Sequence, residues 1–231
     1  MGDCMELWMF VIGSILGSFI CAYSFRFINH ESIVKGRSYC ENCKRQLLWY
    51  ELIPIISYMM LKGRCKTCHH KIRPMHLICE ITGGMIGILS YVRYAIGIEL
   101  IIIMYICFVM MFIAIVDYYT MDVYVLSLVI LFLGELIYLY VLDIDMMFMI
   151  GILCLSIPLT VMNLIFGECM GWGDIQFITL VSIILGKNVL VMVLIASFIA
   201  CSHILIYKRK STTRIPFVPY LVLGVYLIIL V

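Results

Sequence analysis

Apolar residues occur along this chain in long runs, and short polar segments separate the runs. The runs lie at residues 5–27, 76–96, 98–116, 123–142, 145–166, 175–187, 188–207 and 215–231. A helix of roughly 20 residues crosses the hydrocarbon core of a bilayer, which is about 30 Å thick. The pattern therefore predicts an all-α membrane protein, a polytopic bundle of about eight transmembrane helices surrounded by the lipid bilayer.

One polar segment, residues 28–75, is long enough to form a structure of its own. Ten of the sixteen lysines and arginines lie between Arg26 and Arg73, in or beside this segment. We therefore expect a single polytopic membrane domain over residues 1–231. In this domain residues 28–75 are an inserted loop, and the helices of residues 98–231 form the core.

The composition excludes an ordinary soluble domain, and the position of the charges predicts an orientation. Hydrophobic residues make up 65% of the chain and charged residues 13%, whereas soluble domains carry about 25% charge. Cytosolic loops have an excess of Lys and Arg. If residues 28–75 lie in the cytosol, alternation of the helices puts the N-terminus and the acidic link 143–145 outside. The basic residues of 208–214 then lie inside. Nothing in this distribution indicates a nucleic-acid partner.

Four of the eleven cysteines form two CxxC pairs in the basic loop: Cys40, Cys43, Cys65 and Cys68. The 21 residues between the pairs are typical of a zinc ribbon. Thiolates bind metal in a reducing cytosol, where disulfides are rare. The sequence therefore predicts a small cytosolic zinc-ribbon-like loop with a structural zinc, and a redox or metal-free role is the alternative.

Two aspartates stand where apolar runs should meet the cytosol. Asp117 ends the run 98–116, and Asp174 closes Gly171-Trp172-Gly173-Asp174 just before the run 175–187. An ionisable residue at membrane depth costs roughly 2.5–3.5 kcal/mol on insertion scales and usually marks function. Two carboxylates that share a proton and a water can hydrolyse a peptide bond. We expect Asp117 and Asp174 to be such a catalytic pair, with Gly171 and Gly173 letting a substrate approach the backbone.

Each aspartate also has a simpler interpretation. Asp is a favoured helix N-cap, which would explain Asp174, and Asp117 alone could be an interfacial charge. An ion- or proton-coupled transporter could use Asp117, Asp174 and Glu135 as relay carboxylates. A non-enzymatic assembly factor of a secretion machine is a third possibility. Glu135 lies in the middle of the fourth run, where we expect it either to pair with His203 or to be protonated.

Small residues recur at four-residue spacing in the first two runs: Gly13 and Gly17, Ser14 and Ser18, then Gly83 and Gly87. Small side chains let helix backbones approach closely in membranes. The spacing therefore predicts tight packing of helices.

Taken together, these motifs resemble those of the type IV prepilin peptidases, a family of membrane aspartyl proteases of the GxGD type. The resemblance covers nearly the whole chain. It is carried by Gly17-Ser18-Phe19, the four-cysteine loop, Glu80-Ile81-Thr82-Gly83, Asp117-Tyr118-Tyr119-Thr120, Met170-Gly171-Trp172-Gly173-Asp174 and Ile215-Pro216-Phe217-Val218-Pro219-Tyr220. The chain departs from the family pattern at Met121-Asp122-Val123-Tyr124, where the family has Ile-Pro-Asp, and at His76-Leu77, where it has Tyr-Pro.

The resemblance implies a bifunctional enzyme of the bacterial inner or plasma membrane. Such an enzyme cleaves the leader of a type IV prepilin or pseudopilin at the cytosolic face and then N-methylates the new N-terminus with S-adenosylmethionine. Asp117 and Asp174, in the protease core 98–231, would carry proteolysis. Glu80 and the cysteine loop would carry or support methylation, and the His76-Leu77 departure bears on this second activity. Glu80 could instead pair with a basic loop residue such as Arg73. The motifs leave the oligomeric state open.

Overall fold

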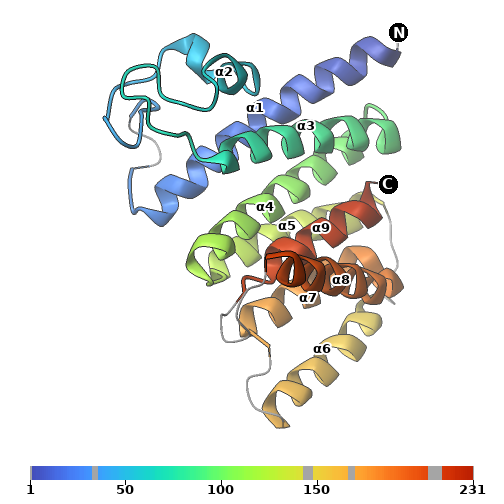
Figure 1. Cartoon of the computed structure of the whole chain (residues 1–231). Helices are drawn as coiled ribbons and strands as arrows, with labels where there is room; N and C mark the ends of the chain where they lie inside the picture. Colours follow the sequence, from blue (N-terminus) through green and yellow to red (C-terminus); the bar gives the residue numbers. More distant parts are fainter. Residues whose placement is uncertain (1, 33–35, 143–147, 166–169, 208–214, 231) are drawn as a thin grey trace. The chain divides into compact units, whose positions relative to one another are not determined.

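The computed structural model describes residues 2–32, 36–142, 148–165, 170–207 and 215–230 (Figure 1). The chain divides into two compact units, Met1–Ala95 and Ile96–Val231, which we describe separately. Each is built from helices. Within the described residues, β-structure is limited to two isolated bridges, Tyr39 with Gln46 and Arg64 with Lys71.

The first unit is a pair of long helices with the cysteine loop between them. Helix α1 covers Gly2–Ile28 and helix α3 covers Pro74–Tyr94. The two helices pack closely along their length (Figure 1). Pro74 at the first position of α3 suits a helix start, because the first backbone N–H of a helix has no intrahelical partner.

Glycines bring the backbones of α1 and α3 into direct contact. A Cβ atom on Gly17 would lie 2.2 Å from the carbonyl oxygen of Cys79, and one on Gly83 would lie 2.4 Å from the oxygen of Gly13. A Cβ atom on Gly87 would likewise lie 2.2 Å from the carbonyl oxygen of Met9. These distances leave no room for any side chain and confirm the close packing that the small-residue spacing predicts.

The loop between α1 and α3 contains two short helical segments. These are the 3-10 turn η1, Trp49–Leu52, and the five-residue helix α2, Ile56–Met60. A turn of 3-10 helix and a single turn of α-helix cannot bury an extended core of their own. Other contacts must therefore hold the loop in shape, and those contacts are given with the site below.

The second unit contains the remaining helices of the chain. The helices are α4 Ile98–Thr120, α5 Val125–Val141, α6 Phe148–Ile165, α7 Trp172–Leu185, α8 Val189–Tyr207 and α9 Val218–Ile229, with the 3-10 turn η2, Gly186–Asn188, between α7 and α8. Helix α4 packs against α5 and α9, and α7 packs against α5, α6 and α9. The Tyr226 hydroxyl of α9 donates a hydrogen bond of 2.6 Å to the carbonyl oxygen of Cys107 in α4.

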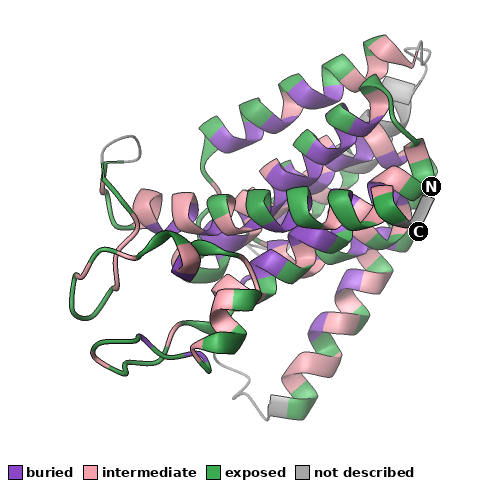
Figure 2. Ribbon diagram, turned by 90° about the horizontal axis from the view of Figure 1, so that it is seen from above, coloured by how far each residue is buried: buried purple, intermediate pink, exposed green. Residues whose placement is uncertain are grey.

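Burial follows the helix faces. Figure 2 shows the long helices with buried residues along one side and exposed residues along the other. Ile103, Ile106 and Met110 of α4 and Phe177 and Val181 of α7 are fully buried. Many large apolar residues are exposed, as expected for helices whose outer surface faces lipid.

Each of the eight predicted runs corresponds to one helix in the part of the chain that the structure describes. Four described segments are long and apolar enough to cross a membrane: Cys4–Ile28, Pro74–Tyr94, Ile98–Thr120 and Trp172–Ile206. The last contains both α7 and α8. Helices α5 and α9 are apolar but shorter. The helical membrane fold with its cysteine loop is confirmed, while the number of membrane crossings stays a prediction.

Some expectations concern residues outside the described ranges. The acidic link Asp143-Ile144-Asp145 and the basic residues of 208–214 both lie there. The orientation of the chain across the membrane therefore also stays a prediction.

Replacing Gly17 with alanine should weaken the packing of α1 against α3, because the added methyl group would collide with the Cys79 carbonyl. Overpacking of this kind typically costs about 1–3 kcal/mol. Unfolding in mixed micelles, followed by circular dichroism as the denaturing detergent increases, should show an earlier transition. The matched control is Gly97→Ala, since a Cβ atom there meets nothing within 4 Å. Equal transitions for the two variants would contradict the packing described here.

Candidate functional sites

Asp117 lies in the last turn of α4. Its side chain is buried, with 4% of its surface exposed. The oxygen Oδ2 is enclosed by protein and has no hydrogen-bond partner among the described residues. The backbone N–H of Val218, at the start of α9, is a hydrogen-bonding neighbour of the carboxylate. A buried carboxylate oxygen without a partner is costly, so this atom marks a place where another polar group is expected.

Asp174 lies in the first turn of α7 and is partly exposed. The chain enters the helix at Gly171, whose carbonyl oxygen accepts a hydrogen bond of 3.1 Å from the Asp174 backbone N–H. A Cβ atom on Gly171 would lie 3.0 Å from Oδ2 of Asp174, and one on Gly173 would lie 2.7 Å from Cβ of Val123. The two glycines therefore leave room for the carboxylate on one side and for the α4–α5 connection on the other.

The fold brings the two aspartates near each other. The end of α4 supplies Asp117 and the beginning of α7 supplies Asp174, which is near enough for its charge to act on the Asp117 carboxyl group. Asp122 is exposed in the α4–α5 connection, where its backbone N–H donates to Oγ1 of Thr120 at 3.3 Å. Two like charges that meet in a low-dielectric environment cannot both ionise freely, which is the electrostatic requirement for sharing a proton.

Glu135 is fully buried in α5, and neither of its carboxylate oxygens has a hydrogen-bond partner among the described residues. The expected pairing with His203 is not found there. Instead, Nδ1 of His203 and the hydroxyl of Tyr220 are 2.9 Å apart. Glu135 is therefore a buried carboxylate, as its position in the fourth run suggests, but the described contacts do not support its pairing with His203.

The four cysteines of the loop come together in the first unit. Their sulfur atoms all lie within 4.8 Å of one another, and those of Cys40 and Cys68 are 3.8 Å apart. Four sulfur donors at these separations suit a tetrahedral zinc ion with no open position. The residues therefore fit a structural zinc, as the spacing predicts. His69 and His70 are not members of this cluster.

The two CxxC segments have the same local structure, a repeat that the sequence analysis did not find. Cys40 N–H donates to the carbonyl of Arg45 at 2.8 Å, and Cys65 N–H donates to that of His70 at 2.9 Å. In each case the residue after the second cysteine, Lys44 or His69, has a positive φ. The β-bridges repeat in the same way, because each joins a residue one position before the first cysteine to a residue six positions after it.

The two halves of the cluster differ electrostatically. Hydrogen bonds from the backbone N–H groups of Cys68 and Thr67 lower the pKa of Cys65 to about 6. Burial raises the pKa of Cys40 to about 11. A thiolate at Cys65 is therefore available at neutral pH, whereas Cys40 becomes a thiolate when a cation offsets the cost of its burial.

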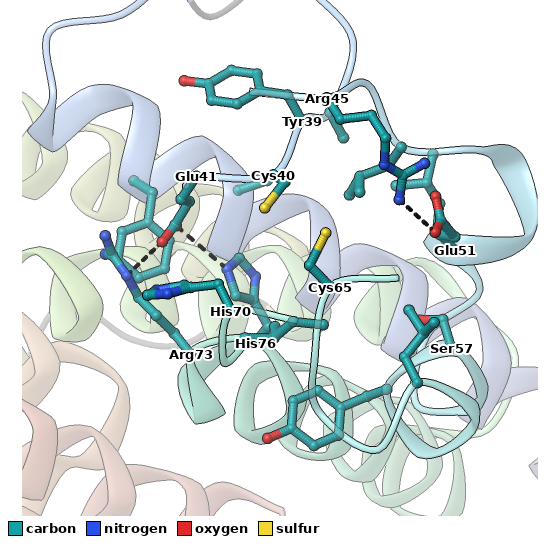
Figure 3. A pocket seen from close by; sticks show the side chains of 18 of the residues that line it. Tyr39, Cys40, Glu41, Arg45, Glu51, Ser57, Cys65, His70, Arg73 and His76 are labelled. Carbon is teal, nitrogen blue, oxygen red and sulfur yellow. Dashed lines mark hydrogen bonds and ion pairs between the residues drawn. The ribbon is translucent and has the colours of Figure 1, made fainter. Parts of the chain in front are cut away.

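A cavity of about 320 Å³ lies between the cysteine loop and the ends of α1 and α3, wholly within the first unit (Figure 3). On one side Glu41 accepts a hydrogen bond of 2.8 Å from Nε of Arg73 and lies 3.9 Å from Nε2 of His76. The neighbouring His76 side chain and the charge of Arg73 lower the pKa of Glu41. This volume is in the range of small-molecule sites.

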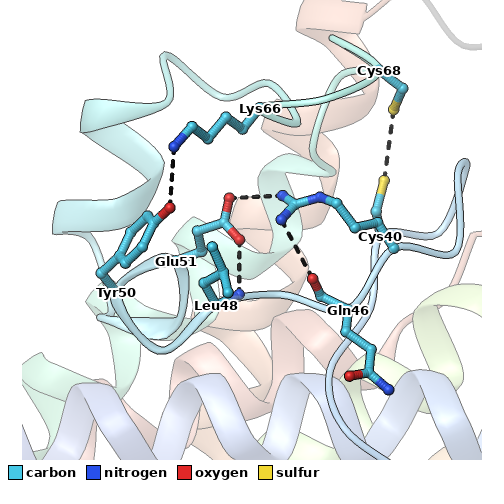
Figure 4. A network of polar contacts seen from close by, with 8 residues as sticks. Cys40, Gln46, Leu48, Tyr50, Glu51, Lys66 and Cys68 are labelled. Atoms are coloured by element: carbon cyan, nitrogen blue, oxygen red, sulfur yellow. Dashed lines mark hydrogen bonds and ion pairs between the residues drawn. The ribbon is translucent and has the colours of Figure 1, made fainter.

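A second carboxylate, that of Glu51, lines the same cavity. Glu51 accepts hydrogen bonds of 2.7 Å from Arg45 and 2.8 Å from the backbone N–H of Leu48 (Figure 4). The bond from Arg45 lowers the pKa of Glu51. Because Arg45 belongs to the first CxxC segment and Glu51 to η1, this ion pair connects the metal site to the rest of the loop.

Glu80 joins the loop to the helices. Its Oε1 accepts a hydrogen bond of 2.8 Å from the hydroxyl of Ser18 in α1, and its Oε2 accepts one of 2.7 Å from the backbone N–H of Ile55. Arg73, the partner suggested by sequence, bonds to Glu41 instead. Ile55 has φ 63° and ψ −53°, and the N–H of Ile56 donates to the carbonyl of Pro54 at 2.6 Å. This γ-turn is a strained conformation for a β-branched residue, so surrounding contacts must hold it.

Comparison with known proteins gives one family. Residues 11–94 match the model of the bacterial peptidase A24 N-terminal domain. A prepilin leader peptidase/N-methyltransferase of Bacillus subtilis (strain 168) is 28% identical over 223 residues, covering 94% of this chain and 90% of that protein. A protein of the same name from Myxococcus xanthus (strain DK1622) is 34% identical over 85 residues, which are 37% of this chain and 25% of that protein.

A third relative of that name, from Pseudomonas putida, is 23% identical over 207 residues and covers 84% of this chain and 71% of its own length. No solved structure matches. The family model covers most of the first unit, and the longer matches extend into the second unit, where both aspartates lie.

Purified protein should contain about one zinc ion per chain, because the four sulfur atoms form one closed tetrahedral site. Replacing Cys40 and Cys43 together with serine should remove the metal, as measured by elemental analysis after dialysis. Cys4→Ser with Cys201→Ser is the matched control, since these two exposed cysteines lie outside the cluster. Equal zinc content in the two double variants would refute the site.

Proposed function

We propose, on the premise that this chain belongs to the bacterial prepilin leader peptidase/N-methyltransferase family, that it cleaves prepilin or pseudopilin leaders with the pair Asp117 and Asp174. The observation that carries the proposal is the meeting of these two carboxylates in the second unit, where their charges interact. Asp117 lies at the C-terminal end of α4, where a negative charge does not favour the helix.

The different surroundings of the two carboxylates suggest different roles in hydrolysis. Asp174, the more exposed of the pair, is placed to take a proton from a water molecule that attacks the scissile carbonyl. Asp117, the buried one, carries the shared proton and donates a hydrogen bond to the carbonyl oxygen as the tetrahedral intermediate forms. The proton that Asp174 took from water then passes to the leaving amine, and the pair returns to its starting state.

The unpartnered oxygen of Asp117 supports this assignment. Oδ2 is enclosed, accepts no hydrogen bond within the described structure, and lies beside the start of α9. In the working enzyme a catalytic water or the substrate would supply the missing partner. The motif Ile215-Pro216-Phe217 would then serve to position the backbone N–H of Val218 at the carboxylate.

The proposed location is the bacterial inner or plasma membrane, with the N-terminus outside and the aspartates facing the cytosol. The apolar helices support the membrane setting. The orientation rests on the ten basic residues between Arg26 and Arg73, which favour a cytosolic loop. A prepilin substrate would present its basic leader on the same side.

We place the methyl-transfer step in the first unit, at the cavity beside the cysteine loop. S-adenosylmethionine has a positively charged centre, a flat base and a carboxylate. The cavity offers carboxylates at Glu31 and Glu41, aromatic rings at Phe25 and Tyr58, and a guanidinium at Arg26, and its volume of about 320 Å³ suits a small molecule. The cofactor would supply the methyl group, and the residues named here would hold it.

Glu80 acts in this scheme as a positioning residue. Both of its oxygens already accept hydrogen bonds, from Ser18 and from the strained turn at Ile55. It therefore fixes a wall of the cavity rather than offering a free carboxylate to the new N-terminus. The structural zinc and the Arg45–Glu51 pair hold the opposite wall.

Asp117→Asn and Asp174→Asn should each lower leader cleavage by about 100-fold or more, the range expected for loss of a general acid or base. An amide keeps the shape of the side chain but cannot share the proton. Cleavage of a co-expressed prepilin, read by intact mass, measures the effect. Asp122→Asn is the matched control, because Asp122 is exposed in the adjoining connection and should leave cleavage unchanged. Substantial processing by either dyad variant would contradict the proposal and favour the transporter or assembly-factor reading.

Glu80→Gln should reduce methylation more than cleavage, because a neutral amide loses the negative charge that strengthens the hydrogen bonds from Ser18 and Ile55. The mature pilin should then include a product lighter by one methyl group. Glu6→Gln makes the same chemical change near the N-terminal end of α1, away from the cavity, and serves as the control. Fully methylated pilin formed at the wild-type rate would remove Glu80 from the methyl-transfer scheme.

A further inference from the structure

Residues 47–61 of the cysteine loop, which we call the η1–α2 segment, expose their apolar side chains and bury their acidic one. This is the reverse of the arrangement in a soluble domain. The large apolar side chains of the segment point outward. Trp49 is 77% exposed, Met60 75% and Met59 69%. The other exposed apolar residues of the segment are Leu48, Leu52, Ile53 and Ile56. A contiguous exposed apolar surface of this kind marks a site of association with another apolar phase.

The polar side chains of the same segment point inward. Glu51 has 7% of its surface exposed and bonds to Arg45 and to the backbone of Leu48. Ser57 and Tyr58 line the cavity beside the metal site (Figure 3). The segment thus satisfies its polar groups within the protein and leaves its apolar groups outside, which is the arrangement required of a surface in contact with lipid.

The position of the segment beside α1 indicates how deep that contact lies. A second cavity, of about 330 Å³, is lined by Phe19, Tyr23 and Arg26 of α1 together with Trp49 and Leu52. Helix α1 has 27 residues and is therefore about 40 Å long, some 10 Å longer than the hydrocarbon core. Arg26 lies in the last turn of α1, and we place this end of the helix in the headgroup region with the η1–α2 segment next to it.

The charges around the segment favour a negatively charged surface. Lys44 precedes it, and Lys62, Arg64 and Lys66 follow it, while the charge of Arg45 is balanced by Glu51. Its own acidic residue, Glu51, is buried and paired. Tryptophan at the membrane boundary and flanking lysines are features of segments that lie in the interface of anionic membranes.

We propose that the η1–α2 segment is a membrane-interface anchor, which inserts its apolar surface among anionic phospholipids at the cytosolic face. The segment is therefore part of the membrane-bound surface rather than of a solvated loop. The Glu80 bond to Ile55 and the γ-turn hold η1 and α2 in the orientation that exposes Trp49, Met59 and Met60. The anchor would keep the zinc site and its cavity at the membrane surface.

Lipid is a better occupant than the apolar segment of a protein substrate for two reasons. The exposed surface is continuous with Phe19 on the outward face of α1, which is 62% exposed and belongs to a membrane span. The positive charges on both flanks match anionic headgroups, whereas a prepilin leader is expected to be basic and would be repelled.

The test uses tryptophan fluorescence of the full-length protein. Trp8→Phe with Trp172→Phe leaves Trp49 as the single tryptophan. The protein is reconstituted, without substrate, into vesicles of phosphatidylcholine and phosphatidylglycerol that include lipid brominated near the headgroup end of its acyl chain. We expect brominated lipid to quench Trp49 strongly and aqueous acrylamide to quench it weakly.

Two comparisons make the result specific. In the same Trp8→Phe, Trp172→Phe background, Trp49→Phe with Thr67→Trp moves the single tryptophan to an exposed position between the second pair of cysteines, where acrylamide rather than lipid should quench it. Replacing Met59 and Met60 with glutamate, in the variant that keeps Trp49, should reduce quenching by lipid. Replacing the same two residues with leucine should preserve it.

The remaining outcomes overturn the proposal. Quenching of Trp49 by acrylamide to the level of the Thr67→Trp protein would show a solvated loop. Quenching by neither agent would show that protein, from the second unit or from another copy of the chain, covers the segment. Because no substrate or activity is involved, these outcomes do not depend on the proposed enzymatic function.

Discussion

The cost of leaving a polar group without a partner in a low-dielectric environment governs this structure. A buried unpaired carboxylate is expensive in any protein and more so within membrane-spanning helices, where water is scarce. Glu80 meets this constraint with two hydrogen bonds, and Glu51 meets it with Arg45 and a backbone N–H. Asp117 does not, because its Oδ2 has no partner among the described residues. At the proposed catalytic site the constraint is thus left for water or substrate to satisfy, and Glu135 in α5 is a second buried carboxylate without a partner among the described residues.

The same constraint explains why the cysteine loop can be both short and ordered. Residues between α1 and α3 have no room for a core, so the four-cysteine cluster, one ion pair and the Glu80 hydrogen bonds hold them. Once these polar groups are satisfied internally, apolar side chains such as Trp49 and Met60 remain on the outside. A loop built in this way is suited to a membrane surface and poorly suited to open solvent.

Much of this arrangement could be predicted from local patterns. Hydrophobic runs located the helices, CxxC spacing located the metal cluster, and small residues at four-residue intervals predicted the contact of α1 with α3. The partners of Glu80 could not be predicted, because Ser18 lies 62 positions away and the Ile55 turn is a conformation that no local preference favours. The outward orientation of the η1–α2 segment cannot be predicted for a related reason. Its residues lie in a polar loop, and only tertiary contacts bury Glu51 and leave Trp49 exposed.

The central claim is that one chain both cuts a prepilin leader and methylates the new N-terminus, with the aspartate pair in one unit and the cavity in the other. Co-expression of the intact protein with a candidate prepilin, followed by intact-mass measurement of the pilin, tests this claim most directly. The account predicts a product shortened by the leader and heavier by one methyl group than the bare mature chain. Pilin that keeps its full leader in the presence of folded, membrane-inserted protein would contradict the account.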